Sequence, residues 1–157
     1  MFEKFEDELK KDASHIVLHN PSDFGNIGTI LRTALGLGIE DVALVRPCAD
    51  VFDPKTVRAS MGAMFRLRIR VYDGFEEYRE KYAERKLYPF MLDASVPLQE
   101  AVKEKPEVWT QVFGNEGRGL PAEFAQMGQA VRIESNEKVD SLNLGIAAAI
   151  GMYEFVK

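Results

Sequence analysis

Short apolar runs alternate with amphipathic stretches along the chain. The apolar runs are rich in Val, Ile, Leu and Phe and are bounded by turn residues, so they predict strands at 15–19, 41–46, 87–93, 108–113 and 130–133. The intervening stretches predict helices at 2–11, 27–37, 53–59, 75–85, 97–103 and 142–156, and a short helix from Pro121. Strands that alternate with helices are typical of an α/β layer architecture.

The stretch 65–71 predicts a further strand with two different faces. Phe65, Leu67, Ile69 and Val71 alternate there with Arg66, Arg68 and Arg70. The three guanidinium groups can contact RNA phosphates, together with Arg58 nearby, or they can form an exposed face that discourages edge pairing. The pattern leaves both interpretations open.

Composition limits the class of protein. The 157 residues are enough for one domain, so we expect a single domain over 1–157. Hydrophobic residues make up 46% and charged residues 29%, which excludes a disordered chain, and a net charge of −5 excludes a wholly basic nucleic-acid coat. The single cysteine, Cys48, excludes an internal disulfide and a Cys-rich zinc site. Without a signal core or a membrane-length apolar run, the sequence predicts a cytoplasmic protein.

Three loops carry candidate chemistry. In the first, Asn26 can cap a helix that carries Arg32 six residues later. In the second, FGNEGRGLP (113–121), three glycines allow a ligand to approach the backbone closely around Glu116. The third is Ser141-Leu142-Asn143, at the start of the last helix. Taken singly, the three loops can also be a capped helix, a tight connection and a helix cap.

Together, in this order, the loops resemble the SpoU (TrmH-like) branch of the SPOUT methyltransferases. The matching segments are NIGTILRTALGLGIEDVALV, VFGNEGRGLP and VRIESNEKVDSLNLGIAAAIGMYEF. The resemblance implies an α/β domain with a mostly parallel sheet flanked by helices and a C-terminal deep trefoil knot. It also implies a homodimer that transfers a methyl group from S-adenosyl-L-methionine to the 2′-hydroxyl of a ribose in tRNA or rRNA, without a metal.

The resemblance assigns roles to residues of this chain. It implies catalytic roles for Asn26, Arg32, Glu116, Ser141 and Asn143. It implies cofactor contacts by Leu92, Asp93, Ala94, Gly114, Asn115, Glu116, Gly119, Leu120, Ile133, Ser141, Leu142 and Asn143. RNA contacts are expected from Arg32, Arg58, Arg66, Arg68 and Arg70. Arg32 is expected either to activate the hydroxyl or to bind the neighbouring phosphate, because a guanidinium is almost never deprotonated in proteins. Glu116 is expected to orient Arg32 or to complement the sulfonium charge.

Some features depart from the family pattern. Asn26 comes so early that we expect no RNA-binding domain before it, and we expect no C-terminal extension after the last helix. A non-catalytic knotted module that binds RNA or the cofactor is the alternative function, and methylation of a base or a small molecule is a third. His15 and His19 are expected to be structural or solvent-facing rather than metal ligands.

Overall fold

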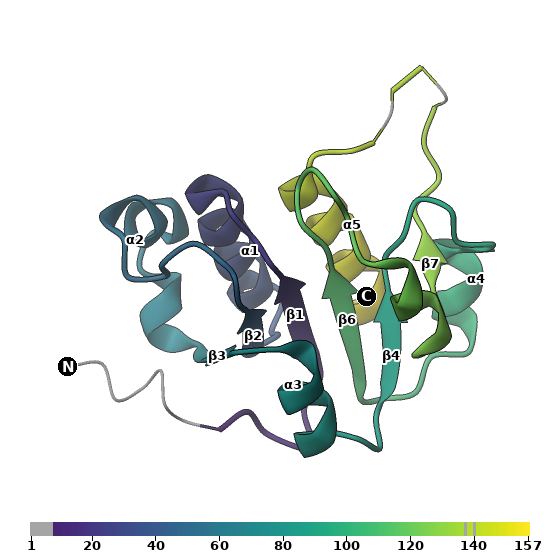
Figure 1. The fold of residues 1–157 in the computed structure, drawn as a ribbon, viewed down its shortest axis with the longest axis horizontal. Helices are drawn as coiled ribbons and strands as arrows, with labels where there is room; N and C mark the ends of the chain where they lie inside the picture. Colours follow the sequence, from purple (N-terminus) through teal and green to yellow (C-terminus); the bar gives the residue numbers. More distant parts are fainter. Residues whose placement is uncertain (1–7, 137, 140) are drawn as a thin grey trace.

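The protein is an α/β fold built on one parallel sheet. The computed structural model describes residues 8–136, 138–139 and 141–157. Five strands lie in the order β3-β2-β1-β6-β4, and every neighbouring pair is parallel (Figure 1). The α/β architecture with a mostly parallel sheet is thereby confirmed. The strands are β1 (His15–His19), β2 (Asp41–Val45), β3 (Arg68–Tyr72), β4 (Lys86–Pro89) and β6 (Trp109–Phe113).

Helices cover both faces of this sheet. In Figure 1, α1 and α5 lie behind it and α3 lies in front. The helices are α1 (Phe24–Gly36), α2 (Pro54–Ser60), α3 (Phe75–Lys81), α4 (Leu98–Lys103) and α5 (Leu144–Val156). Two 3₁₀ helices, η2 (Ala63–Arg66) and η3 (Ala122–Gln126), and a small parallel pair, β5 (Val96–Pro97) with β7 (Val131–Arg132), complete the described elements.

Each face of the sheet has its own apolar core. Along β1, Ile16 and Leu18 pack into the cluster shared with α1 and α5, whereas Val17 packs into the cluster shared with α3. This alternation follows from the two-residue period of a strand. Because both faces are covered, the central strands have apolar residues on both sides, which is why short apolar runs predicted them.

Several predicted elements differ from the structure. The predicted strand 87–93 is β4 and ends at Pro89, and the predicted helix 75–85 is α3 and ends at Lys81. The predicted strand 65–71 is η2 followed by β3, because Met61 and Gly62 both adopt left-handed φ values, of 53° and 84°, and turn the chain before it extends. Helix α1 starts at Phe24 rather than residue 27, because Asp23, not Asn26, is its N-cap. Of the predicted helix 2–11, residues 2–7 lie outside the described part, and 8–11 form no helix.

A buried polar chain joins β1, β6 and α3. Arg85 Nε donates to Thr110 Oγ1 at 2.7 Å, the Thr110 hydroxyl lies 2.8 Å from that of Tyr78, and Tyr78 lies 2.8 Å from His15 Nδ1. His15 Nε2 lies 2.6 Å from the Lys10 carbonyl, so Nε2 donates and Nδ1 accepts. Burial, and then the nearby charge of Arg85, lower the pKa of His15 to about 4. His15 is therefore a neutral, structural histidine.

Candidate active site

The glycine-rich loop after β6 is a tight hairpin. Asn115 and Gly119 exchange backbone hydrogen bonds at 3.2 and 2.9 Å, and Asn115 Oδ1 accepts from the backbone N–H groups of Gly117 and Arg118. Gly119 has a φ of +68°, which favours glycine. At Gly114, a Cβ would lie 2.3 Å from the carbonyl carbon of Gly119, so any side chain would force the hairpin open. These two glycines are required by the close approach of the two strands of the hairpin.

Hydrogen bonds join this hairpin to the loop between β1 and α1. Asn115 Nδ2 donates to the Asn20 carbonyl at 2.8 Å. The Glu116 carboxylate accepts from the Ser22 hydroxyl at 2.9 Å, from the Ser22 N–H at 3.1 Å and from the Asp23 N–H at 2.8 Å. Burial alone would raise the pKa of Glu116, but the hydrogen bonds from Asp23 and Ser22 outweigh it and lower the pKa. Glu116 therefore fixes the start of α1 as a carboxylate.

The starts of α1 and α5 meet at Gly145. A Cβ placed there would lie 3.4 Å from Asn26 Oδ1 and 3.6 Å from the Thr29 methyl group. Asn143 is the N-cap of α5, and its Oδ1 accepts from the Ile146 N–H at 3.2 Å. The first and third candidate loops, far apart in the sequence, are thus side by side.

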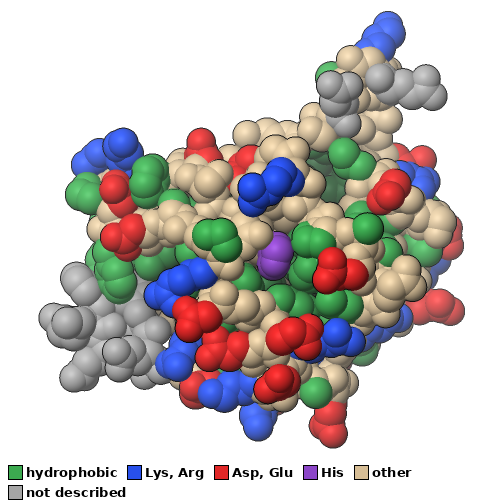
Figure 2. Space-filling view, viewed as in Figure 1, with side chains coloured by type: hydrophobic (Ala, Val, Ile, Leu, Met, Phe, Trp, Pro, Cys, Tyr) green, Lys and Arg blue, Asp and Glu red, His purple; other side chains and the backbone are tan. Residues whose placement is uncertain are grey.

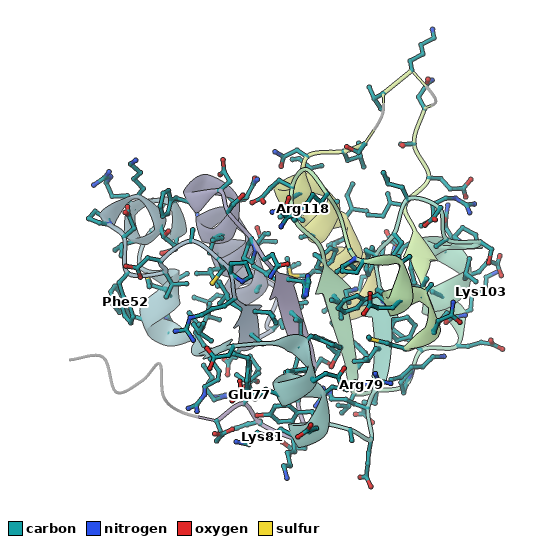
Figure 3. All side chains as sticks on the ribbon, viewed as in Figure 1. Phe52, Glu77, Arg79, Lys81, Lys103 and Arg118 are labelled. Atoms are coloured by element: carbon teal, nitrogen blue, oxygen red, sulfur yellow. The ribbon has the colours of Figure 1, made fainter. Side chains whose placement is uncertain are left out.

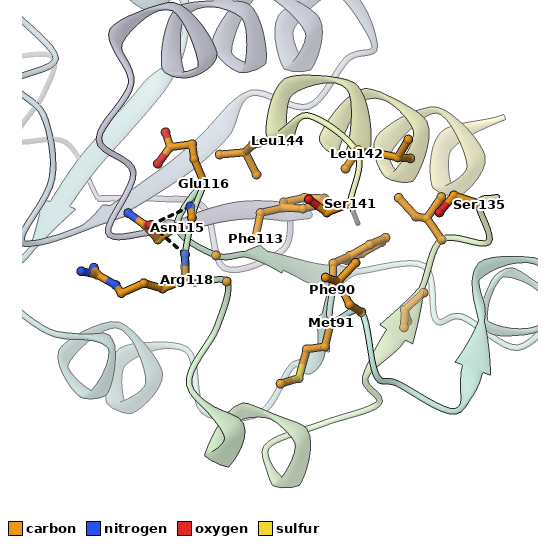
Figure 4. Close-up of a pocket in the computed structure, with 17 residues that line it drawn as sticks. Phe90, Met91, Phe113, Asn115, Glu116, Arg118, Ser135, Ser141, Leu142 and Leu144 are labelled. Atoms are coloured by element: carbon orange, nitrogen blue, oxygen red, sulfur yellow. Dashed lines mark hydrogen bonds between the residues drawn. The ribbon is translucent and has the colours of Figure 1, made fainter. Parts of the chain in front are cut away.

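A pocket of about 180 Å³ opens between the glycine hairpin and two other loops (Figure 4). Its floor contains the rings of Phe90 and Phe113, which stack with centroids 4.6 Å apart. The segment before α5 adds Ser141 and Leu142. The pocket therefore combines an aromatic, apolar interior with a few polar side chains, such as Asn115 and Ser141, as small-molecule sites do.

The sequence matches the SpoU rRNA Methylase family over residues 13–153. This chain belongs to that family. As a SpoU family protein, it is 34% identical over 145 residues to an uncharacterised tRNA/rRNA methyltransferase from Synechocystis, covering 88% of this chain and 51% of that protein. It is 29% identical to a 23S rRNA guanosine-2′-O-methyltransferase from Bacillus subtilis, over 94% of this chain and 60% of that protein. The chain spans about half the length of the curated relatives that it matches.

Solved structures of the SpoU family share this fold. An AdoMet-bound rRNA methyltransferase from Sinorhizobium meliloti superposes with a TM-score of 0.82 at 31% identity, covering 97% of this chain and 59% of that one. A structure that describes 2-OH methylation of C/U34 on tRNA gives a TM-score of 0.84 at 30% identity, covering 93% and 95% of the two chains. In this SpoU family chain, no described helix is long and apolar enough to cross a membrane.

The pocket contains many, but not all, of the residues expected to bind the cofactor. Leu92, Gly114, Asn115, Glu116, Gly119, Ile133, Ser141 and Leu142 line it. The remaining four lie outside the lining. Asp93 and Ala94 border a neighbouring hollow, Leu120 packs against the core on the α3 side, and Asn143 caps α5. The lining also includes residues to which the resemblance assigned no cofactor contact, namely Phe90, Met91, Phe113, Gly117, Arg118, Val131, Ser135, Leu144 and Ala147.

The arginines expected to bind RNA do not form one face. Arg68 makes two hydrogen bonds to the fully buried Asp41, at 2.6 and 3.0 Å, so it has a structural role. Arg70 lies on β3, 3.8 Å from Glu8, whereas Arg66 lies on η2, so the predicted three-arginine strand face is wrong. Arg58 is exposed on α2.

Arg32 lies outside the pocket. It lines a different hollow between α1 and residues 60–66, together with Arg66 and the strained Met61. Within the described residues, neither guanidinium has a hydrogen bond or an ion pair. Glu116 makes its hydrogen bonds to the loop before α1, and no contact joins it to Arg32 in the described part of the chain. The expectation that Glu116 orients Arg32 directly therefore has no support in the geometry.

Proposed function

We propose that this chain transfers a methyl group from S-adenosyl-L-methionine to the 2′-hydroxyl of a ribose in tRNA or rRNA. The observation that carries the proposal is the pocket that the second and third candidate loops form together, with the first loop beside the start of α5. The hairpin 114–119 forms one wall, Ser141 and Leu142 form another, and Asn26 lies beside the start of α5. Relatives at about 30% identity that are named as ribose-directed RNA methyltransferases support the same reaction.

The pocket suits the cofactor. The stacked Phe90 and Phe113 rings and Leu142 offer an apolar surface for an adenine ring, and the hairpin offers backbone donors and acceptors for its polar edge. When bound, the cofactor supplies a methyl group that its sulfonium already activates. The chain then has to hold the ribose in line and help remove the hydroxyl proton. We assign ribose contacts to Ser141, which is exposed at the pocket rim.

We propose that the protein works as a homodimer. Helix α5 exposes an apolar stripe at helical spacing, namely Ile146 (54% exposed), Ile150 (36%), Tyr153 (53%) and Val156 (39%). A second copy of the chain can bury this stripe. Arg32, exposed on the adjacent helix α1 and outside the pocket of its own chain, would then act at the pocket of the second copy, where it binds the phosphate next to the target ribose.

We infer, also from the resemblance, that the segment leading to α5 threads through a loop as a trefoil knot. The placement of α5 against α1 and β6, with Gly145 beside Asn26, is compatible with it. We likewise infer one domain, since both apolar cores share the same sheet.

The test of the proposed function is transfer of labelled methyl from S-adenosylmethionine to unmodified tRNA and rRNA transcripts, followed by nuclease digestion and nucleoside mass spectrometry. A 2′-O-methylnucleoside is the expected product, and its base identifies the target. A methylated base would assign a different acceptor. Cofactor binding without transfer to either RNA would favour the non-catalytic module.

A further inference from the structure

Arg118 is an exposed cation on a rigid support at the mouth of the pocket. Its backbone N–H donates to Asn115 Oδ1 at 3.1 Å inside the hairpin, so the main chain at this position is fixed. Its guanidinium has no hydrogen bond or ion pair with any residue that the structure describes. An arginine held by its backbone but free at its tip is ready to bind an anion.

The guanidinium of Arg118 is directed away from the interior of the pocket. Figure 4 shows it on the opposite side of the hairpin from Phe90, Ser141 and Leu142, where the cofactor would lie. Figure 3 places it at the carboxyl ends of the central strands, on the face that α3 partly covers. An anion bound by Arg118 would therefore lie outside the cofactor pocket and close to its entrance.

His19 lies close to the hairpin that carries Arg118, because Asn115 of the hairpin donates at 2.8 Å to the carbonyl of Asn20, the residue after His19. It is the last residue of β1, and its ring packs edge-on against Phe124 (centroids 5.0 Å apart) and Phe75 (6.5 Å). Nδ1 is buried without a partner among the described residues, which leaves Nε2 as the nitrogen that reaches solvent. Since His15 is fully buried, the imidazole visible in Figure 2 is that of His19. Burial, and then the positive charge of Arg118, lower the pKa of His19, so it is neutral at pH 7.

We propose that Arg118 and His19 form a subsite for a backbone phosphate of the substrate RNA, on the α3 side of the pocket entrance. This assignment rests on the proposed function. Arg118 supplies a charge-assisted, bidentate contact, and Nε2–H of His19 supplies a neutral hydrogen bond. Arg32 lines a different hollow, so the subsite would hold a different stretch of the RNA from Arg32.

Acidic residues limit where the RNA can run on this face. Glu76 and Glu77 lie in the first turn of α3, and Figure 3 labels Glu77 well below Arg118. Arg46, at the carboxyl end of β2, is already paired with Asp73 at 2.6 Å. Like charges would repel the phosphates from α3, so the RNA would follow the edge formed by the strand ends.

The experiment compares the wild type with Arg118→Ala, Arg118→Lys and His19→Phe. His19→Phe keeps an aromatic ring against Phe75 and Phe124 but removes the N–H. Arg79→Ala is the matched control, because it removes one exposed charge from α3 on the same face. For each variant, the affinity for unmodified tRNA and rRNA transcripts is measured over a range of salt concentrations. The affinity for S-adenosylhomocysteine is measured by calorimetry.

We expect Arg118→Ala to weaken RNA binding about tenfold near 0.1 M salt. The salt slope, meaning the slope of log affinity against log salt concentration, should fall in magnitude by about one. Arg118→Lys should restore the slope but only part of the affinity, and His19→Phe should weaken binding about threefold. Arg79→Ala should change neither quantity.

Three results would overturn the subsite. Unchanged RNA affinity in Arg118→Ala, with a wild type that does bind RNA, would remove the subsite and leave the proposed function intact. A loss of S-adenosylhomocysteine affinity alone would assign Arg118 to the cofactor carboxylate instead. A wild type that binds neither transcript would overturn the proposed function together with the subsite.

Discussion

Glu116 shows how one carboxylate can join two loops of a candidate site. Its oxygens accept from Ser22 and Asp23, which lie 94 and 93 residues earlier in the chain. Asp23 is also the N-cap of α1, so Glu116 fixes the residue that starts the helix carrying Asn26 and Arg32. Its hydrogen bonds position the start of α1, and the sequence could show the acid but not its partners.

Replacement of Glu116 by Gln should destabilise the fold by about 1 kcal/mol, because an amide cannot accept at both oxygens from the three groups that bind the carboxylate. The reduction should appear as a lower urea midpoint with an unchanged slope. Glu123→Gln, at an exposed acid on η3, is the control and should leave the midpoint in place. Equal midpoints for both variants would contradict the positioning role.

Arg32→Ala should abolish methyl transfer. The cofactor affinity should stay within about twofold of the wild-type value, because Arg32 lies outside the pocket of its own chain. Steady-state turnover and calorimetric titration with S-adenosylhomocysteine measure the two quantities separately. Substantial turnover by the variant would rule out an essential role for this guanidinium. Arg66→Ala, in the same hollow, shows whether any loss is specific to position 32.

At the scale of elements, the glycine hairpin depends on backbone contact. Gly114→Ala should place a methyl group 2.3 Å from the Gly119 carbonyl carbon, so we expect a destabilisation of about 1–3 kcal/mol and a loss of cofactor affinity. Gly117→Ala is the matched control, since its nearest neighbour would be Asn115 Oδ1 at 3.6 Å, an ordinary contact. Thermal unfolding measures the stability of both variants, and calorimetry measures their affinity for S-adenosylhomocysteine. Wild-type affinity in Gly114→Ala would contradict the prediction.

The polar chain between β1, β6 and α3 should make stability depend on pH. The folded pKa of His15, about 4, lies below its unfolded value of about 6.5, so the unfolded state binds more protons between them. The contribution of His15 is complete above pH 6.5 and is lost as the pH falls toward 4. We expect a loss of about 1 kcal/mol between pH 7.5 and 5.5, measured by urea unfolding. In His15→Gln this loss should disappear; if it persists, another group is responsible.

The sequence predicted elements better than it predicted their ends. The strands were found because buried parallel strands are continuous apolar runs. The start of α1 was missed because Asp23 and Asn26 are both good N-caps, and only the tertiary contacts of Asp23 with Glu116 distinguish them. The alternation over 65–71 predicted one continuous strand and gave no sign of the left-handed turn at Met61 and Gly62. Phe90 and Val131 were not recognised as pocket residues because, in a sequence, apolar residues that line a pocket look the same as core residues.

At the scale of the whole molecule, the apolar stripe on α5 should control assembly. Ile150→Asp places a charge in the middle of the stripe, so we expect a monomer of 17.7 kDa where the wild type has twice that mass. Light scattering coupled to size exclusion measures the masses. Val139→Asp makes the same chemical change at an apolar residue outside α5 and should leave the dimer intact. A monomeric wild type would contradict the dimer and, with it, the role of Arg32 in the second copy.

The hydrogen bonds between the glycine hairpin and the β1–α1 loop also bear on the order of folding. They join residues more than 90 positions apart, and the pocket is complete only when Ser141, Leu142 and the start of α5 have joined them. Such non-local contacts form late, because closing a long loop is entropically unfavourable until many contacts reward it. We therefore expect the proposed cofactor pocket to form at the end of folding. A partly folded chain has no pocket, and bound cofactor stabilises only molecules whose last helix has docked.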